Sequence, residues 1–559
     1  MGCATWNMYI GTLNFECFFG NRRMSKPSSQ PPKLPSQAEV QPLLNLLNAG
    51  QLPQAEATAK ALLGTYPNAF ILHNVLGVAL EGQGKFEDAA ASYRKTLAIE
   101  PKIAEIHFNL GVVLTNLGKQ EEAIASYRKA VALKPGLAVA HFNLGTALQA
   151  QGKLQEAIAS YRKAVAIEPG FFEAYGNLGT VLQQQGMLEE AVASYRKALA
   201  IHPDAKGHFN LATALRDQGK LDEAIVSYHH ALAINPGYVE AHNNLGEALR
   251  DQGKMQEAVE SYQNALAIDP DNAPANFNFA QFLFDAARYE EAIPYFKKSQ
   301  LEDWQERILY CLYKSEKFDE FKDMLQNIVA TTRHTSPFLA TLSTHYAINF
   351  GGEDPYNFCK NAMDFVYQNS IAPLAAENSQ LLSDLLRDIK HAEIAERKQG
   401  RLHHGIQSAG NLFKRPEASF RTLATLIKQE FANYRKRFAG ADCELIKSFP
   451  AEFEFTSSWY VKMQQGGHLT SHIHELGWIS GAVYLAMPKS KLNPDEGRFE
   501  YGPHGDNYPQ KHTDFPVNNV APNVGDIVLF PSSLFHRTIP FNSNEERICI
   551  AFDLKPTQQ

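Results

Sequence analysis

The stretch "GLAVAHFNLGTALQAQGKLQEAIASYRKAVAIEP", residues 136–169, decides the fold of the first half of the chain. Gly152 in "QGK" has the character of a helix C-cap, and Pro169 stops whatever helix precedes it. Ala157 and Tyr161, four residues apart, share one face of the second helix. Gly145, which lacks a side chain, lets the first helix approach the second. The stretch therefore predicts two packed helices joined by a short turn.

This unit repeats along the chain. Successive unit-ending prolines are 34, 34, 34, 34, 33 and 34 residues apart, at Pro67, Pro101, Pro135, Pro169, Pro203, Pro236 and Pro270. The pattern resembles the tetratricopeptide repeat, which has two helices per 34 residues. It predicts an array over 34–303 of about eight units, the first a weaker capping unit. The unit 204–236 is one residue short, so the start of its first helix should shift.

An asparagine recurs in the first helix of most units. The array resembles the tetratricopeptide portion of O-linked GlcNAc transferases, and this resemblance implies that such a ladder grips an extended peptide along the concave face of a superhelix. The alternative is that these asparagines are repeat consensus on a solvated surface. Nothing downstream resembles the glycosyltransferase half of those enzymes. The candidate peptide-binding residues are Asn109, Asn143, Asn177, Asn210, Asn244 and Asn278.

Composition excludes several classes of protein. The 559 residues carry a net charge of −7 without a long run of one sign, so no nucleic-acid partner is expected. No run of about 18 apolar residues exists, so no membrane association is expected. The six cysteines are scattered and form no CxxC pair, which favours a reducing, cytoplasmic setting. Residues 1–33 are expected to be a disordered or mis-called extension, with Met24 competing with Met1 as the start.

The pattern of apolar and polar residues changes twice after the array. Residues 304–370 lose the 34-residue period but are expected to remain helical, with "CKNAMDFVYQNS" (359–370) resuming a helix after the break at "GGEDPYNF". Residues 371–559 begin with helical segments. From residue 444 they become short apolar runs separated by Gly, Pro and Asn. Such runs predict an α+β domain built on a barrel or jelly roll.

Polar residues on these expected strands form a constellation. His472 and His474 in "HIHELGWISGAVYL" are two residues apart, so on a strand both face the same way. His536 follows "VGDIVLFPSSLF", and Arg547 comes eleven residues later in "ERICIAFDL". Three ligands on one face of a metal leave positions open for a cosubstrate and oxygen. An arginine fork nearby can bind a carboxylate bidentately.

These motifs, with "GRFEYGP", resemble the 2-oxoglutarate/Fe(II)-dependent oxygenases, over about residues 400–556. The resemblance implies a double-stranded β-helix (jelly roll) that uses Fe(II) and 2-oxoglutarate. It implies that His472 and His536 are iron ligands, that Arg547 anchors 2-oxoglutarate, and that Tyr484 lines the pocket. No catalytic side chain beyond the metal site is expected.

The sequence departs from the usual His-x-Asp/Glu pair, because His474 stands where the carboxylate would be. Three readings are open: all three histidines bind the metal, Glu475 supplies the carboxylate through a local bulge, or water takes the third place beside His472 and His536. The expected function is an oxygenase of the hydroxylase type, with an array that recruits a protein or peptide. The alternative is a non-catalytic scaffold with a structural or sensory metal-binding domain. A zinc hydrolase would leave Arg547 without a role.

Overall fold

The computed structural model describes residues 34–301, 303–391, 396–397, 401–408, 411–450, 452–475 and 477–557. The expected N-terminal extension, residues 1–33, lies outside this part of the chain. The chain forms two compact units that divide between Asp269 and Pro270. Within the described residues, no helix is both long enough and apolar enough to cross a membrane.

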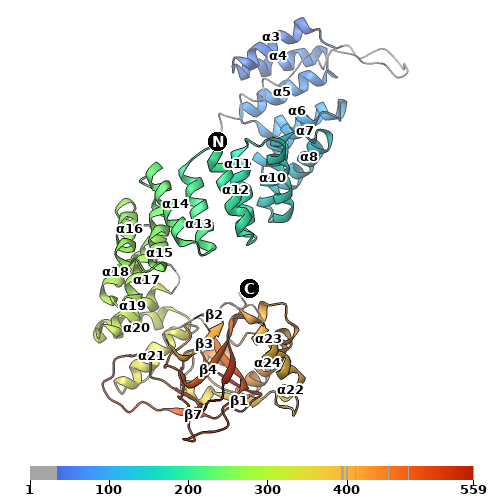
Figure 1. Cartoon of the computed structure of the whole chain (residues 1–559). Coiled ribbons are helices and arrows are strands. Elements are labelled where there is room, and N and C mark those ends of the chain that lie inside the picture. Colours follow the sequence, from blue (N-terminus) through green and yellow to red (C-terminus); the bar gives the residue numbers. More distant parts are fainter. Residues whose placement is uncertain are drawn as a thin grey trace. The chain divides into compact units, whose positions relative to one another are not determined.

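Antiparallel helix pairs fill the first unit, as the 34-residue period predicts (Figure 1). The weak first repeat also forms a pair. The helices are α3 (Gln37–Asn48), α4 (Leu52–Thr65), α5 (Phe70–Gly82), α6 (Phe86–Ile99), α7 (Ala104–Asn116), α8 (Gln120–Leu133), α9 (Ala138–Ala150), α10 (Leu154–Ile167), α11 (Phe172–Gln184), α12 (Leu188–Ile201), α13 (Ala205–Asp217), α14 (Leu221–Ile234), α15 (Val239–Asp251) and α16 (Met255–Ile268).

Two glycines explain the geometry of a repeat. Gly152, in the turn after α9, has a φ of +70°, which side-chain-bearing residues adopt only at a cost. Gly145 lies so close to the next helix that a Cβ there would be 2.8 Å from Cε1 of Tyr161. Tyr161 itself is fully buried. In five repeats the glycine and the tyrosine form this same packing contact, which explains why they recur together, whereas the short repeat has Ala212 at the glycine position.

The short repeat is accommodated at the start of its first helix. Helix α13 begins at Ala205, two residues after Pro203, whereas α9 begins three residues after Pro135. Asp204 caps α13, and its side chain accepts a hydrogen bond of 2.7 Å from the Gly207 N–H. The expected shift is confirmed, and the N-cap supplies its physical reason.

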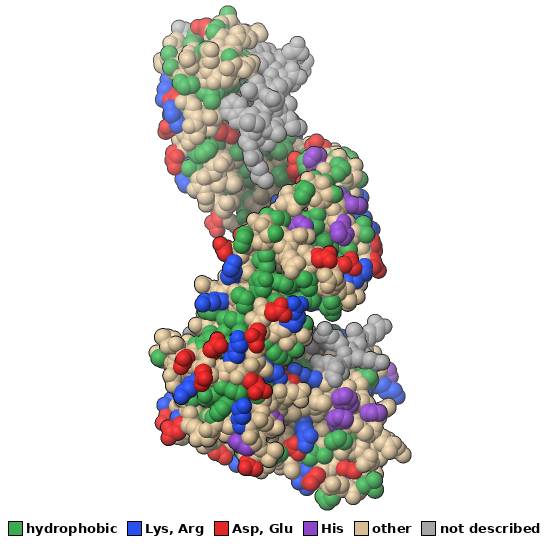
Figure 2. Space-filling view, turned by 90° about the vertical axis from the view of Figure 1, so that its left-hand side faces the viewer, with side chains coloured by type: hydrophobic (Ala, Val, Ile, Leu, Met, Phe, Trp, Pro, Cys, Tyr) green, Lys and Arg blue, Asp and Glu red, His purple; other side chains and the backbone are tan. Residues whose placement is uncertain are grey.

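The outer surface of the first unit mixes charges of both signs, and Figure 2 shows Lys and Arg interspersed with Asp and Glu on the face in view. Second helices of successive repeats are joined by ion pairs whose side chains are all about half exposed. Exposed pairs of this kind contribute little each. The pairs are Arg94–Glu122, Arg128–Glu156, Arg162–Glu190 and Arg196–Glu223.

The second unit begins with helices that continue the paired pattern. Ala287 and Glu316, each with a φ of +57°, occupy turns where earlier pairs have glycine. The paired geometry therefore extends beyond the residues in which the period can be read. These helices are α17 (Ala273–Asp285), α18 (Tyr289–Ser299), α19 (Trp304–Lys314), α20 (Phe318–Thr331) and α21 (Pro337–Asn349).

An antiparallel sheet domain follows the helices. Seven strands are ordered β1-β8-β5-β10-β4-β3-β2, and a smaller sheet is ordered β7-β6-β9. The strands are β1 (Tyr367–Ser370), β2 (Glu396–Arg397), β3 (Leu402–Ser408), β4 (Phe453–Leu469), β5 (Ile479–Ala486), β6 (Phe499–Gly502), β7 (Asn518–Val520), β8 (Asp526–Pro531), β9 (Phe535–Thr538) and β10 (Arg547–Pro556).

One expectation for residues 359–370 is wrong. Instead of resuming a helix, they form a short 3-10 turn, η1 (Ala362–Phe365), and strand β1. Strand β1 pairs with β8, with Tyr367 opposite Leu529. The partner lies about 160 residues away in sequence, so its hydrogen bonds override the local pattern.

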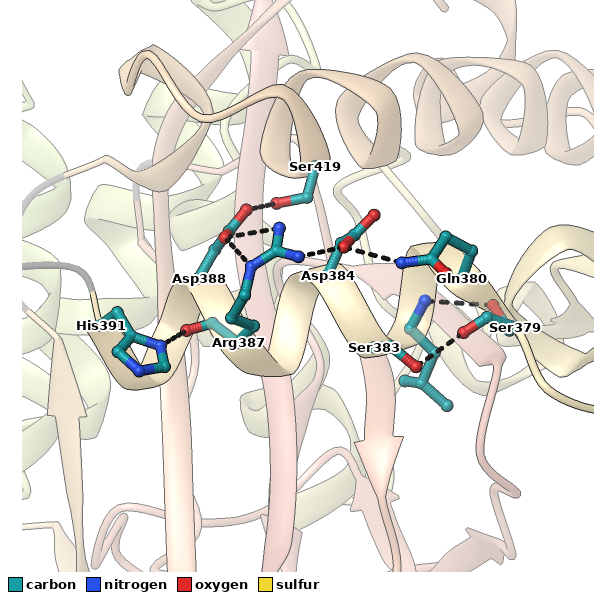
Figure 3. Close-up of polar contacts among 9 residues, drawn as sticks. Ser379, Gln380, Ser383, Asp384, Arg387, Asp388, His391 and Ser419 are labelled. Atoms are coloured by element: carbon teal, nitrogen blue, oxygen red, sulfur yellow. Dashed lines mark hydrogen bonds and ion pairs between the residues drawn. The ribbon is translucent and has the colours of Figure 1, made fainter.

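Helices accompany the sheet in the second unit. Helix α24 has buried residues, including Leu423 and Ile427, at helical spacing along its length. Figure 3 shows how α23 is tied to it: Asp388 on α23 accepts a hydrogen bond of 2.6 Å from Ser419 on α24, and Arg387 binds Asp388 and Asp384. The helices are α22 (Ala372–Ala375), α23 (Gln380–His391), η2 (Leu412–Lys414), α24 (Ala418–Arg437) and α25 (Glu444–Lys447).

Candidate metal site

The segment that carries the paired histidines is not the strand that the sequence predicts. Strand β4 ends at Leu469, and His472 and His474 lie in the connection to β5. His472 forms an isolated antiparallel bridge with His536, with backbone hydrogen bonds of 3.1 and 3.0 Å. The His474 N–H donates to the Ser532 carbonyl over 3.2 Å. These three bonds hold the segment against the turn before β9.

The bridge brings three imidazoles together. His472, His474 and His536 each offer a ring nitrogen, and these nitrogens all lie within 4.8 Å of one another. The ring centroids are 4.3 to 5.3 Å apart. This spacing suits ligands that share one metal ion.

The other nitrogen of each ring already has a partner. Nδ1 lies 2.8 Å from the Thr470 carbonyl in His472 and 3.2 Å from the Leu534 carbonyl in His536. In His474, Nδ1 contacts the Asp553 carboxylate. Carbonyls and carboxylates only accept hydrogen bonds, so each Nδ1 carries the proton and each Nε2 keeps its lone pair for a metal.

The environment keeps two of these rings neutral. Burial, reinforced by the neighbouring His474, lowers the pKa of His472 to about 3. Burial, reinforced by His472 and His474, lowers the pKa of His536 well below its ordinary value. Neutral imidazole is the form that binds metals.

Asp553 was not singled out from the sequence. It also accepts hydrogen bonds from Ser480 and Ser457, over 2.7 and 2.8 Å. Burial alone would raise its pKa, but His474 and the two serines lower it overall. The available signal was parity: Asp553 is six residues after Arg547 on β10, so both face the same way.

Glu475 points elsewhere. Its carboxylate lies 3.0 Å from the guanidinium of Arg307 on α19, so it is not one of the three clustered ligands. Burial raises the pKa of Glu475, and the charge of Arg307 opposes that rise.

Arg547 is a buried cation, only 2% exposed. Its guanidinium carbon lies 5.1 Å from the centre of the Tyr484 ring, and Nη1 faces the sulfurs of Met463 and Cys549 at 3.8 and 3.7 Å. Among the described residues no carboxylate lies within ion-pair distance of Arg547, whose Nε donates to the Gly497 carbonyl over 3.3 Å. Burying an unpaired cation costs several kcal/mol, so the site suits an anionic ligand.

The asparagine ladder occupies equivalent positions of α7, α9, α11, α13, α15 and α17, where each side chain is half-buried. The Asn177 amide donates to the Tyr161 hydroxyl over 3.4 Å. Asn109, Asn143 and Asn244 interact in the same way with the tyrosine 16 residues earlier. An amide has two N–H groups and a carbonyl, so one bond to tyrosine leaves capacity for a ligand.

Family comparisons agree with both halves of this description. The family described as "Putative 2OG-Fe(II) oxygenase" matches residues 457–553, which span the three histidines, Arg547 and Asp553. Tetratricopeptide repeat families match 44–102, 79–138, 147–186, 172–204, 209–273 and 249–307. Family models thus match tetratricopeptide repeats in the first part of the chain and a "Putative 2OG-Fe(II) oxygenase" domain near its C-terminus.

Solved structures similar to the chain are repeat proteins. YrrB, described as a TPR protein with an unusual peptide-binding site, is 24% identical and covers 33% of this chain and 96% of its own, with a TM-score of 0.32. The MamA protein is 27% identical over 31% of this chain and 94% of its own, with a TM-score of 0.29. A repeat protein from Cytophaga hutchinsonii is 19% identical over 42% and 97%, with a TM-score of 0.38. None of the curated proteins matches the chain.

Proposed function

We propose that the oxygenase-family domain is an active Fe(II)- and 2-oxoglutarate-dependent oxygenase of the hydroxylase type, built on a double-stranded β-helix. One observation supports this most strongly. Three histidines with defined tautomers converge on one point, while Arg547, on a strand that also carries Asp553, the partner of His474, is a buried cation without a carboxylate. A structural metal site has no use for such an arginine.

The residues present fit both groups. His472, His474 and His536 would hold Fe(II), and Arg547 with the Tyr484 hydroxyl would bind the distal carboxylate of 2-oxoglutarate. When bound, Fe(II), 2-oxoglutarate and O2 supply the oxidation that converts a substrate C–H to C–OH, with release of succinate and CO2. The chain itself supplies binding, orientation and exclusion of water.

Several side chains perform those tasks. Asp553 holds the His474 ring through Nδ1, and the Trp459 ring stacks on it at 5.7 Å. Phe499 and Phe530 flank His536, with ring centroids 5.5 and 4.5 Å away. This apolar surround limits water around the ligand, and the fixed tautomer spares reorganisation when metal binds.

The third ligand is where this site departs from its family. We propose that His474 binds the metal where the family has a carboxylate. The Asp553 carboxylate, which contacts Nδ1 of His474, then supplies the negative charge from the far side of that ring. His474→Ala tests this assignment. If His474 is the ligand, Co(II) affinity should fall about as far as it does in His536→Ala, whereas direct ligation by Glu475 predicts a much smaller loss.

The decisive experiment measures binding of 2-oxoglutarate at the metal, and its turnover. The full chain, purified without oxygen and supplied with Fe(II) and 2-oxoglutarate, should show a weak visible charge-transfer band and should form succinate when O2 is admitted. The band needs no substrate, so it is the primary readout. Absence of both the band and succinate from metal-loaded protein would contradict the proposal.

A non-catalytic metal-binding scaffold is the second candidate. The observation that favours it is that His474 stands in place of a carboxylate, because an all-imidazole set also suits zinc. That function predicts tight Zn(II) binding without any effect of 2-oxoglutarate on the spectrum of the Co(II)-loaded protein.

We also propose that the repeats recruit a protein or peptide through the asparagine ladder. The test is a binding selection from a random peptide library on the full chain. Replacing Asn109, Asn143 and Asn177 by alanine should reduce retention of selected peptides, with Asn116→Ala, at the end of α7, as a control. Equal retention by the triple variant would assign the ladder to packing alone.

A further inference from the structure

Helices α19 and α21 belong to the same compact unit as the sheet, and both contact the segments that carry the histidines. Arg307 on α19 reaches the turn that follows His474. Thr341 on α21 reaches the turn that precedes His536. The end of the helical region therefore touches the candidate metal site at two points.

Arg307 is held rigidly before it reaches this turn. Its Nε donates to Asp303 over 3.0 Å, one helical turn earlier. Its guanidinium carbon lies 5.3 Å from the centre of the Phe284 ring and 5.4 Å from that of Phe338. The side chain is only 13% exposed, so the guanidinium presents Nη1 to Glu475 from a fixed position.

Glu475 occupies the middle of a tight turn. The Gly477 N–H donates to the His474 carbonyl over 3.3 Å, and the next residue, Trp478, donates its N–H to Leu554 over 2.7 Å. The far end of the turn is thus fixed on β10. The ion pair with Arg307 holds Glu475, within this turn, against α19.

Helix α21 supports the opposite side. The Thr341 hydroxyl donates to the Ser533 carbonyl over 2.8 Å, and both residues are buried. The neighbouring carbonyl, of Ser532, accepts the His474 N–H. The two helices therefore hold the two segments whose hydrogen bonds bring His474 next to His536.

We propose that Arg307 is a positioning residue for the metal centre. Its ion pair with Glu475 fixes the turn that begins at His474, so that a helix of the paired-helix region sets the place of the third ligand. This inference rests on the proposed function in one respect, namely that His472, His474 and His536 are the metal ligands. It also gives Glu475 a role outside the coordination sphere.

The chain offers a matched pair for comparison. Arg216 and Glu247 join two repeats of the first unit over 2.6 Å, with side chains 24% and 23% exposed. Arg307 and Glu475 are 3.0 Å apart, with side chains 13% and 33% exposed. Both pairs fasten segments distant in sequence, but only the second lies beside a candidate ligand. A purely structural role predicts that the two pairs behave alike.

The experiment uses the full chain and Co(II) as the probe. Arg307→Met should weaken Co(II) binding about tenfold and alter the visible ligand-field spectrum, because supports behind a ligand typically contribute 10- to 100-fold in affinity. Arg216→Met should leave both readouts unchanged, whatever it does to the melting temperature. Arg307→Lys should recover part of the affinity, since it keeps the charge.

Three outcomes would overturn the proposal. A lowered melting temperature in Arg307→Met with unchanged Co(II) affinity and spectrum would make the pair a structural fastening. Tighter Co(II) binding by that variant would mean that Arg307 withholds Glu475 from the metal. Failure of the unaltered chain to bind Co(II) would contradict the proposed function as well as this inference. That outcome is distinguishable from failure of the inference alone, because it is seen in the chain without any substitution. If Arg307→Met does not fold, Arg307→Gln, which keeps a polar side chain but removes the charge, provides the same test and should show the same tenfold loss.

Discussion

The repeat region and the sheet domain are stabilised over very different sequence distances. In a repeat, Tyr161 packs on Gly145, 16 residues earlier, and the same contact recurs along the array. In the sheet domain, His474 contacts Asp553, 79 residues later, and that contact occurs once. The array therefore repeats its stabilising contact many times, whereas the metal site makes each of its contacts once. Single substitutions should therefore affect ligand binding strongly in one region and stability mildly in the other.

Removing a ligand should have the largest effect. His536→Ala should lower Co(II) affinity at least roughly 100-fold and abolish succinate formation, because two imidazoles cannot hold the ion as three do. Metal content by mass spectrometry checks it. His391→Ala, at an exposed position on α23, is the control and should bind metal normally. Normal metal content in His536→Ala would remove that residue from the ligand set.

Arg547→Met should separate cosubstrate binding from metal binding. Charge-assisted hydrogen bonds contribute about 1.5–3 kcal/mol each, so the 2-oxoglutarate concentration for half-maximal rate should rise roughly 100-fold. Co(II) affinity should change less than twofold. Because Arg547 makes one long hydrogen bond, of 3.3 Å to the Gly497 carbonyl, and no ion pair among the described residues, the melting temperature should change little. Parallel loss of metal and cosubstrate would contradict the anchoring role.

Asp553→Asn should produce a smaller loss at the same site. Asparagine keeps the shape but removes the charge that orients the His474 ring, so Co(II) affinity should fall roughly tenfold. Ser457→Ala removes only one of the hydrogen bonds to Asp553 and should cost less. If Asp553→Asn binds Co(II) normally, stacking by Trp459 must suffice to hold the ring.

The separation of contacting residues along the sequence also explains which contacts could be predicted. The repeats were readable because the spacing of Gly145, Gly152, Tyr161 and Pro169 reports contacts within one unit. Helices α19 and α20 keep the same turn with Glu316 in place of glycine, so the pairing continued after its sequence signal had ended.

The sheet domain was harder to predict because its contacts join residues that are far apart in the sequence. The residue types and order of His472, His474, His536 and Arg547 were sufficient to nominate them, although His472 and His474 lie in a connection and not on the predicted strand. The bridge between His472 and His536, by contrast, depends on how two connections meet. Arg307 carries no motif at all, since its relevance arises only from where α19 packs.

Within the array, a substitution at a buried contact should lower the free energy of unfolding more than a substitution in a turn. Gly145→Val places a branched side chain against the Tyr161 ring and should lower the free energy of unfolding by about 1–3 kcal/mol. Gly136→Val is the control, because a Cβ there meets nothing within 4 Å. Both variants should bind Co(II) normally. A metal defect in Gly145→Val would show that the two regions are energetically linked.

The smallest effect should come from an exposed ion pair. Arg128 and Glu156 lie 2.5 Å apart, but their side chains are 53% and 54% exposed. Water and salt screen such a pair, so Arg128→Gln should lower the free energy of unfolding by about 0.2–1 kcal/mol, and less at high salt. A double-mutant cycle with Glu156→Gln, followed by urea unfolding, isolates the pair. A coupling above about 2 kcal/mol would mean that the ladder of equivalent pairs acts cooperatively. The array would then depend on single contacts much as the metal site does.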